Sequence, residues 1–366
     1  MASSILLVIA GILVLLGGAE LLVRGASRLA LTAGISPLVV GLTVVAFGTS
    51  TPELAVSVRA ALGGAGGADI ALGNVIGSNT ANVLLILGLS ALIAPLGVSR
   101  QLVRLDVPIM VACSLLLMWM AADGELGRPE GVLLLAGIVV YTASTIVRSR
   151  KESAPAEGGG ATRRSGRRLL TDGGLVIAGL VGLIAGASWL VDGAVVLAQA
   201  LGVGELIVGL TVVAVGTSLP ELATSALAAW RGERDIAVGN VVGSNIFNIL
   251  CVLGASALSA RGGLEVSPQA RAFDLPVMLA VAVLCLPIFF TGFRISRLEG
   301  SIFLGLYVVY VVFLVLFASG DPNVATLRAV VVWGVAPTAA VVLGIASLRQ
   351  GRRERTAPAP TDDLRD

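Results

Sequence analysis

Long apolar segments recur along the chain, separated by short polar or glycine-rich connections. Because about 20 mostly apolar residues can cross a bilayer as a helix, these segments predict membrane-spanning helices. The predicted spans are 4–23, 35–59, 69–95, 104–122, 130–148, 173–198, 205–230, 235–259, 273–293, 300–318 and 325–348. A β-barrel would instead show segments of about 10 residues with alternating polarity. The pattern therefore predicts an all-α polytopic membrane protein.

Two parts of the chain share one sequence pattern. Residues 41–57 and 209–225 agree at 14 of 17 positions, and residues 69–92 and 235–258 agree at 16 of 24. Each half contains five predicted spans, so the second half must enter the membrane from the opposite side. That arrangement is an inverted-topology repeat, in which secondary transporters place their binding site near the bilayer midplane. The span at 325–348 has no counterpart in the repeat.

The domain organisation follows from this repeat and from the composition of the connections. We expect a first five-helix repeat at 1–148, a cytoplasmic linker rich in Gly, Ser and Arg at 149–171, a second inverted five-helix repeat at 172–318, an additional transmembrane helix at 319–348 and a disordered cytoplasmic tail at 349–366. Placing the linker in the cytoplasm puts twenty of the 25 Lys and Arg residues inside. Since cytoplasmic loops carry an excess of Lys and Arg, we expect the N-terminus outside and the C-terminus inside.

The composition agrees with a membrane protein and excludes several kinds of site. The chain is 56% hydrophobic and only 13% charged, whereas a soluble domain carries about 25% charged residues. It has no histidine, so no imidazole can bind a metal or relay a proton, and its three cysteines lie in apolar segments that suit core packing. No nucleophile–base pair and no nucleotide-binding loop is recognisable. We therefore expect no enzyme and no cofactor, and an ion gradient as the energy source.

Each repeat places one carboxylate deep in an apolar span, within "GTSTPE" at 48–53 and "GTSLPE" at 216–221. A charge at that depth costs roughly 2.5 kcal/mol or more unless it is paired or hydrated. The apolar stretches around Glu53 and Glu221 contain no Lys, Arg or His, so a cation from solution is the expected partner. A protonated core glutamate is the alternative, and the duplication of the whole motif argues against it. Four other acidic residues near span ends are interpreted as structural: Glu20, Asp106, Asp192 and Asp274.

Oxygen atoms suited to a cation surround each glutamate. Thr49 and Ser50 lie four and three residues before Glu53, so both hydroxyls can share its helix face. Pro52 has no N–H for the carbonyl of Gly48 and disturbs that helical turn. Carbonyls freed in this way are tolerated in a membrane where they line a cavity enclosed by protein. The second repeat has Gly216, Thr217, Ser218, Pro220 and Glu221 in the same positions.

The second motif of each repeat, "GNVIGSNTAN" or "GNVVGSNIFN", adds further oxygens. Ser78 and Asn82 are four residues apart, as are Ser244 and Asn248, so each pair shares a helix face. A set made only of oxygen suits Ca²⁺, which takes about 6–8 oxygen ligands, and also Na⁺; soft metals prefer sulfur or imidazole. Asn74 and Asn240 are further inward-facing candidates, and four glycines predict close helix packing: Gly73, Gly77, Gly239 and Gly243.

With both motifs present twice, the chain resembles the sodium/calcium exchanger family of the calcium/cation antiporter superfamily, and its compact prokaryotic members in particular. The resemblance implies that Glu53 and Glu221 are the central Ca²⁺ carboxylates. It also implies that the Ca²⁺ and Na⁺ sites are completed by Thr49, Ser50, Thr217, Ser218, Ser78, Ser244 and the carbonyls of Ala46 and Ala214, with Asn82 and Asn248 at two equatorial positions. Potassium-dependent relatives carry an aspartate at the position of Asn248, so this chain is expected to work without K⁺.

We therefore expect an antiporter that exchanges Ca²⁺ for Na⁺ by alternating access, electrogenically and with three Na⁺ per Ca²⁺. The second, third, seventh and eighth spans would hold the ions, and the first and sixth would slide or rock across them. A Ca²⁺/H⁺ antiporter using the same two glutamates is the main alternative, and a cation channel is a further one. The expected location is a bacterial plasma membrane, with Ca²⁺ and Na⁺ as substrates, lipid as surroundings and no nucleic-acid partner.

Overall fold

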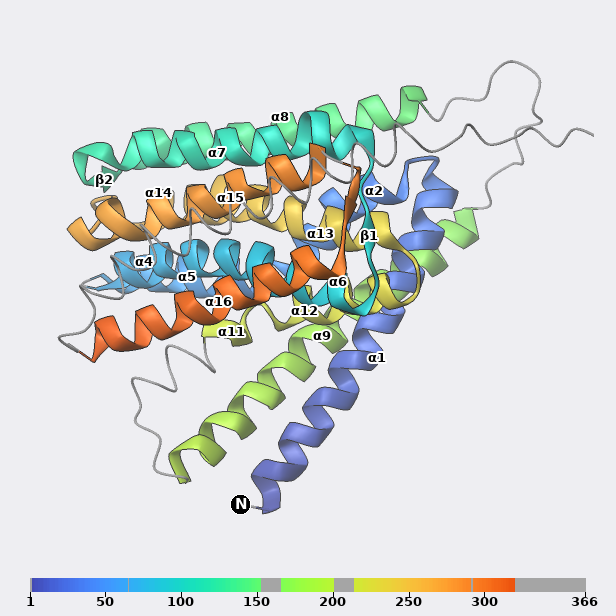
Figure 1. Ribbon diagram of the computed structural model, residues 1–366, viewed down its shortest axis with the longest axis horizontal. Helices are drawn as coiled ribbons and strands as arrows, with labels where there is room; N and C mark the ends of the chain where they lie inside the picture. The colour runs from blue at the N-terminus through green and yellow to red at the C-terminus, as the bar shows by residue number, and fades with distance from the viewer. Residues whose placement is uncertain (1, 65, 153–165, 201–213, 291, 320–366) are drawn as a thin grey trace, which may run out of the picture.

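The computed structural model describes residues 2–64, 66–152, 166–200, 214–290 and 292–319 of the 366-residue chain. Helices make up nearly all of this part (Figure 1). Eight of the described helices are long and apolar enough to cross a membrane, and the bent pair Pro37–Thr49 and Thr51–Gly63 is a ninth candidate. The prediction of an all-helical integral membrane protein is confirmed. The predicted span at 325–348 and the predicted tail lie outside the described residues.

In the first repeat the second, third and fourth spans are assembled from several helical pieces, and the first and fifth are single helices. The helices of this repeat are α1 (Ala2–Ala33), α2 (Pro37–Val40), η1 (Gly41–Val45), α3 (Ala46–Thr49), α4 (Thr51–Gly63), α5 (Gly67–Ala81), η2 (Asn82–Leu87), α6 (Gly88–Ile93), η3 (Leu102–Asp106), α7 (Val107–Met120), η4 (Ala121–Asp123) and α8 (Arg128–Glu152). The elements η1, η2 and η3 are π-helical turns within longer helices, and such turns are frequent at functional sites.

The second repeat follows the same plan. Its described helices are α9 (Gly166–Ala200), α11 (Ala214–Gly216), α12 (Leu219–Trp230), α13 (Arg234–Phe247), η6 (Asn248–Leu253), α14 (Gly254–Ser259), η7 (Ala270–Asp274), α15 (Leu275–Phe290) and α16 (Arg297–Ala318). The π-helical turns recur at matching places, because η2 begins at Asn82 and η6 at Asn248. Similarly, η3 ends at Asp106 and η7 at Asp274.

Two short strand pairs, which the all-α prediction did not include, tie the repeats together. Strand β1 (Leu96–Gly97) pairs antiparallel with β4 (Arg294–Ile295), and β2 (Glu125–Leu126) pairs antiparallel with β3 (Leu264–Glu265). Strands β1 and β2 lie at opposite ends of the helical bundle (Figure 1). In both pairs a connection after the third span of one repeat meets a connection after the fourth span of the other. This reciprocal pairing is consistent with inverted repeats.

Helices α1 and α9 lie side by side and cross the rest of the bundle obliquely (Figure 1). Glycines let the two backbones meet. A Cβ added at Gly11 would lie 2.6 Å from the backbone nitrogen of Leu190, and one at Gly18 would lie 2.6 Å from that of Leu183. The contacts run in opposite directions along the two helices, so α1 and α9 are antiparallel. Small residues allow this approach between membrane helices.

The helix ends extend beyond several predicted boundaries. Helix α1 continues to Ala33 rather than ending at residue 23, because its second, more polar half still packs against α9 and α12. Helices α8 and α9 continue to Glu152 and from Gly166, so helix occupies both ends of the predicted linker at 149–171. Residues 153–165, the middle of that linker, lie outside the described residues.

The third and eighth spans form the centre of the molecule. In the most apolar 18-residue stretch of each span, the buried share is 72% for Gly67–Ile93 and 94% for Arg234–Ser259. The corresponding share is only 28% for Ser3–Thr32. Close packing is confirmed for two of the four motif glycines. A Cβ added at Gly239 would lie 2.9 Å from the carbonyl oxygen of Leu38, and one added at Gly243 would lie 2.6 Å from that of Leu42. The segment that would face Gly73 and Gly77 by symmetry, 205–213, lies outside the described residues.

Candidate ion-binding site

Both Pro-Glu motifs lie directly after breaks in their helices. The break in the second span bends it by 45°. Ser50 at the first break has φ −83° and ψ 8°, and Ser218 at the second has φ −88° and ψ 7°, so both depart from helical geometry in the same way. Pro52 and Pro220 follow in the first turn of the next helix, where a missing N–H leaves no hydrogen bond unmade. The predicted proline-associated breaks are confirmed.

The two carboxylates are fully buried and each is contacted by the other repeat. The Ser218 hydroxyl donates to Glu53 Oε1 at 3.2 Å, and the Ser50 hydroxyl donates to Glu221 Oε1 at 2.9 Å. Both glutamates lie in the first turn of a helix, whose N-terminal dipole favours negative charge. Within the described residues neither glutamate forms an ion pair with a basic side chain.

Threonine and asparagine side chains form a second reciprocal pair of contacts across the repeats. Thr49 Oγ1 donates to Asn240 Oδ1 at 3.1 Å, and Thr217 Oγ1 donates to Asn74 Oδ1 at 3.4 Å. Asn74 Nδ2 in turn donates to the carbonyl of Glu53 at 3.2 Å, and Asn240 makes the matching contact with its own repeat's glutamate at 3.5 Å. Each asparagine therefore connects the helix break of its own repeat to the threonine of the other.

The serines of the second motif lie beside the carboxylates. Ser78 Oγ donates to Glu53 Oε1 at 3.5 Å and accepts from Ser218 Oγ at 3.2 Å. Ser244, its counterpart, is fully buried beside Glu221. The ten predicted polar side chains therefore gather where the two repeats meet: Glu53, Glu221, Thr49, Thr217, Ser50, Ser218, Ser78, Ser244, Asn82 and Asn248. Nine of the ten are buried, and Thr217 is half-buried.

Five buried oxygens in this group have no hydrogen-bond partner among the described residues. They are Glu53 Oε2, Glu221 Oε2, Asn82 Oδ1, Asn248 Oδ1 and Ser244 Oγ. Leaving one buried acceptor unsatisfied costs about 1–3 kcal/mol, and more for a charged group. A hard cation bound by several such oxygens would remove this cost, since Ca²⁺ is held by carboxylate, amide and hydroxyl-type oxygens. All five atoms belong to side chains of the predicted ion site.

The two predicted carbonyl ligands have different surroundings. The carbonyl oxygen of Ala46 accepts from the Ser50 N–H at 3.0 Å and from Thr49 Oγ1 at 3.4 Å. It is therefore already hydrogen-bonded within its own helix. In the second repeat the Ser218 N–H donates to the carbonyl of Val215 at 3.1 Å. The roles of Ala46 and Ala214 as ligands stay predictions.

The sequence reasoning missed Asn79 and Asn245, which contact the side-chain amides of Asn248 and Asn82. Asn82 Nδ2 donates to Asn245 Oδ1 at 2.9 Å, and Asn248 Nδ2 donates to Asn79 Oδ1 at 3.1 Å. Both residues end the tripeptide "GSN" that occurs once in each repeat. That repetition was the available signal, but it does not indicate that the asparagine contacts the opposite repeat.

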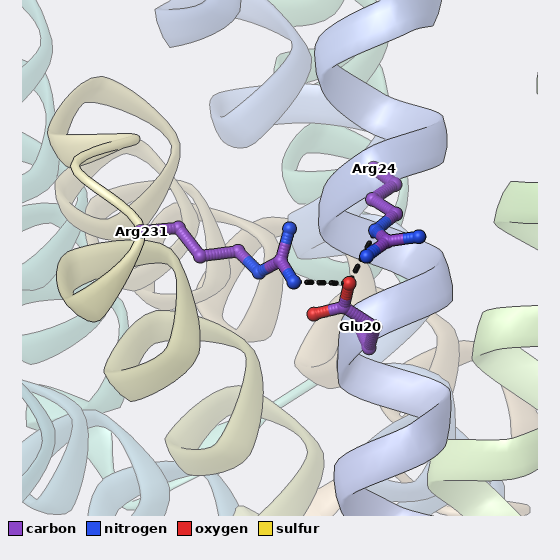
Figure 2. Close-up of polar contacts among 3 residues, drawn as sticks. All are labelled: Glu20, Arg24 and Arg231. Carbon is purple, nitrogen blue, oxygen red and sulfur yellow. Dashed lines mark ion pairs between the residues drawn. The ribbon is translucent and has the colours of Figure 1, made fainter.

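Two of the four acidic residues interpreted as structural, Glu20 and Asp106, make contacts of that kind. Glu20 on α1 forms ion pairs with Arg24 of the same helix and with Arg231 at the C-terminal end of α12 (Figure 2). Asp106 is buried and accepts from the Tyr141 hydroxyl at 3.1 Å. The contact with Arg231 links the oblique helix pair to the helix that carries Glu221.

Comparisons with known proteins identify relatives along most of the chain. The inner membrane protein YrbG of Escherichia coli is 41% identical over 248 residues, which are 66% of this chain and 75% of that protein. The sodium/calcium exchanger MaX1 of Methanosarcina acetivorans is 33% identical over 310 residues, which are 74% of this chain and 87% of that protein. A solved structure of the sodium-calcium exchanger NCX_Mj, soaked with 10 mM Na⁺ and zero Ca²⁺, superposes with a TM-score of 0.73 at 31% identity, covering 84% of this chain and 98% of that one.

A family model described as "Sodium/calcium exchanger protein" matches residues 3–147 and 173–316. The two matched blocks contain one copy each of the Pro-Glu and Gly-Ser-Asn motifs. They also contain every residue of the candidate site described above. The chain belongs to the sodium/calcium exchanger family.

Proposed function

We propose that this protein is a secondary active antiporter that exchanges Ca²⁺ for Na⁺ by alternating access across a bacterial plasma membrane. Membership of the exchanger family makes it a cation antiporter and not an enzyme. The observation that carries the Na⁺/Ca²⁺ assignment is the pair of fully buried carboxylates, Glu53 and Glu221, each with one oxygen that lacks a partner within the described part of the chain.

The charge of this pair decides which ions fit. Burying two unpaired carboxylates is costly, so the ionised site requires cations. One Ca²⁺ neutralises Glu53 and Glu221 together, and Asn82 and Asn248 contribute oxygens without adding charge. Na⁺ accepts the same oxygen ligands. We propose three Na⁺ per Ca²⁺, because the surrounding hydroxyls supply ligands for more sodium ions than charge neutrality alone would hold.

The contacts across the repeats support a site that both halves build together. Ser50 of one repeat bonds Glu221 of the other, and Ser218 bonds Glu53. A cation bound here contacts both repeats, so its arrival and departure can be coupled to their relative movement. We assign that movement to α1 and α9, which lie obliquely across the central spans and meet each other through glycines. The proposed orientation places the N-terminus outside and the C-terminus in the cytoplasm.

The decisive experiment is ⁴⁵Ca²⁺ uptake into proteoliposomes that contain the full-length protein and internal Na⁺, with pH clamped on both sides. Saturable uptake that requires the outward Na⁺ gradient is the expected result. Uptake that follows an imposed pH gradient and ignores Na⁺ would establish Ca²⁺/H⁺ exchange instead. Non-saturating flux without counter-transport would establish a channel. Protein-free liposomes and vesicles with equal Na⁺ on both sides are the controls.

A further inference from the structure

The amide groups of Asn82 and Asn248 are held in one orientation by the opposite repeat. Each has a buried Oδ1 with no hydrogen-bond partner in the part of the chain that the structure describes, and each donates its Nδ2 to another asparagine. The acceptors are Asn245 Oδ1, at 2.9 Å from Asn82, and Asn79 Oδ1, at 3.1 Å from Asn248. The orientation of an amide is assigned from such contacts. Here each contact engages the NH₂ group of a site residue and leaves its buried carbonyl oxygen without a donor among the described residues.

The orientations of Asn79 and Asn245 are themselves fixed by groups that can only accept. Asn79 Nδ2 donates to the backbone carbonyl of Asn245 at 3.2 Å and approaches Met278 Sδ at 3.8 Å. Asn245 Nδ2 contacts Met110 Sδ at 3.4 Å. A carbonyl oxygen and a thioether sulfur carry no proton, so the partner of each must be an NH₂ group. The Oδ1 atoms of Asn79 and Asn245 are then the ones that face the site asparagines.

We propose that Asn79 and Asn245, backed by Met278 and Met110, are positioning residues that keep the carbonyl oxygens of Asn248 and Asn82 directed at the bound cation. A reversed amide would present two N–H groups with partial positive charge to that cation. The proposal rests on the proposed function, because it deepens the same ion site. It assigns a role to two methionine sulfurs on α7 and α15, outside the helices that carry the site residues.

The two halves of this arrangement differ in a way that yields a sharp test. The Asn79 NH₂ group has two acceptors, the Asn245 carbonyl and Met278, whereas the Asn245 NH₂ group has Met110 alone among the described residues. Removing the Met110 sulfur leaves the Asn245 NH₂ group without an acceptor. If the side-chain amide of Asn245 then turns over, its NH₂ group faces the NH₂ group of Asn82. Two donors cannot bond to each other, so the amide of Asn82 must turn over as well. Removing the Met278 sulfur leaves the stronger backbone acceptor of Asn79 in place.

Methionine-to-leucine substitutions isolate this effect, because the two side chains have similar volume and the exchange is usually well tolerated in a packed core. Met110→Leu should raise the KM for Ca²⁺ about fivefold, the change expected from one lost hydrogen bond, while the maximal rate stays close to that of the unmodified protein. Met278→Leu should raise it by less than about twofold. Met118→Leu, the same exchange on α7 away from these contacts, is the matched control.

A double-mutant cycle separates positioning from packing. In Asn82→Asp both side-chain oxygens are acceptors, so no NH₂ face can turn toward the cation. The double variant Asn82→Asp/Met110→Leu should therefore have the same KM for Ca²⁺ as the single variant Asn82→Asp. If the Met110 sulfur only fills space, its removal would raise KM equally in both backgrounds and would lower the melting temperature of the purified protein.

The measurements use the full-length protein in proteoliposomes, with Na⁺-gradient-driven ⁴⁵Ca²⁺ uptake at a series of Ca²⁺ concentrations and thermal unfolding of the same preparations. An unchanged KM in Met110→Leu overturns the proposal, as does an equal rise in Met110→Leu and Met278→Leu. If the unmodified protein shows no Na⁺-driven uptake, the proposed function fails first. Equilibrium ⁴⁵Ca²⁺ binding to the unmodified protein and to Met110→Leu, Met278→Leu and Met118→Leu then tests the positioning role by itself, with the same order of affinities expected.

Discussion

Glu20 on α1 and Arg231 at the end of α12 form an ion pair across the boundary between the oblique helix pair and the central helices (Figure 2). The side chains are 24% and 31% exposed, so the pair is partly shielded from water. Arg24 contacts the same carboxylate oxygen from within α1 and is 54% exposed. Since α12 also carries Glu221, this contact connects the proposed moving helix to one of the two carboxylates of the proposed ion site.

Breaking this ion pair should change the rate of exchange more than the stability of the protein. Arg231→Gln and Glu20→Gln remove a contact that favours the described arrangement of α1 and α12, so movement of α1 becomes easier. A partly exposed pair is worth roughly 0.2–1 kcal/mol, which predicts exchange up to about fivefold faster in either variant. Initial rates of Na⁺-driven ⁴⁵Ca²⁺ uptake measure the effect.

Two controls identify the pair itself as the cause. The double variant should match either single variant, because both remove the same contact. Arg24→Gln leaves the pair intact and should exchange at the unmodified rate. Equal acceleration by Arg24→Gln, or no acceleration in the other variants, would show that the ion pair does not restrain α1.

Neutralising either buried glutamate should abolish Ca²⁺ uptake while the protein stays folded. Glu53→Gln and Glu221→Gln remove a ligand charge, and a neutral amide is less costly to bury than a carboxylate. We therefore expect uptake at the level of protein-free liposomes and a melting temperature equal to or above that of the unmodified protein. Glu265→Gln, at an exposed position at the end of β3, is the control. Normal uptake by a folded Glu53→Gln protein would remove the carboxylate pair from the mechanism.

The sequence predicted the parts of this site that depend on local spacing. Hydropathy located the spans that the structure describes, and the Pro52 and Pro220 positions located the helix breaks, because an apolar run of spanning length and a missing N–H act within one segment. The sequence did not reveal that Ser50 meets Glu221 while Ser218 meets Glu53. Those contacts depend on how the two repeats interlock, which residue spacing along one helix does not determine.

The features that sequence reasoning missed have equally physical causes. Asn79 lies one residue after Ser78 and so on a different helix face, where it looks like an ordinary buried polar residue until the opposite repeat is in place. The strand pairs β1–β4 and β2–β3 are only two residues long, too short for an alternating pattern. Helix α1 exceeds its predicted length because Arg24 and Arg28 interrupt the apolar run without interrupting the helix.

Exchange should proceed with K⁺ absent from both sides of the membrane. Asn248 is neutral, and its Nδ2 donates to Asn79 Oδ1, so this position adds no charge that would need a potassium ion. Na⁺-driven ⁴⁵Ca²⁺ uptake measured with choline in place of K⁺ should remain within about twofold of the rate measured with K⁺, a difference equivalent to less than 0.5 kcal/mol. An absolute requirement for K⁺ would show that other groups of the site bind it.

Membrane potential should shift the Ca²⁺ distribution that the protein maintains. In the proposed cycle Glu53 and Glu221 neutralise one Ca²⁺, whereas three Na⁺ on the same two carboxylates leave one net positive charge, so each cycle would move one charge. One elementary charge crossing the membrane is worth about 2.3 kcal/mol per 100 mV, and an imposed potential of about 60 mV should change the equilibrium Ca²⁺ ratio about tenfold.

In Na⁺-loaded vesicles the net charge moves outward during Ca²⁺ uptake, so an inside-positive potential set with K⁺ and valinomycin should increase accumulation and an inside-negative potential should lower it. Valinomycin with equal K⁺ on both sides is the control. Accumulation that does not respond to the potential would indicate two Na⁺ per Ca²⁺ and would remove the third sodium ion from the proposed cycle.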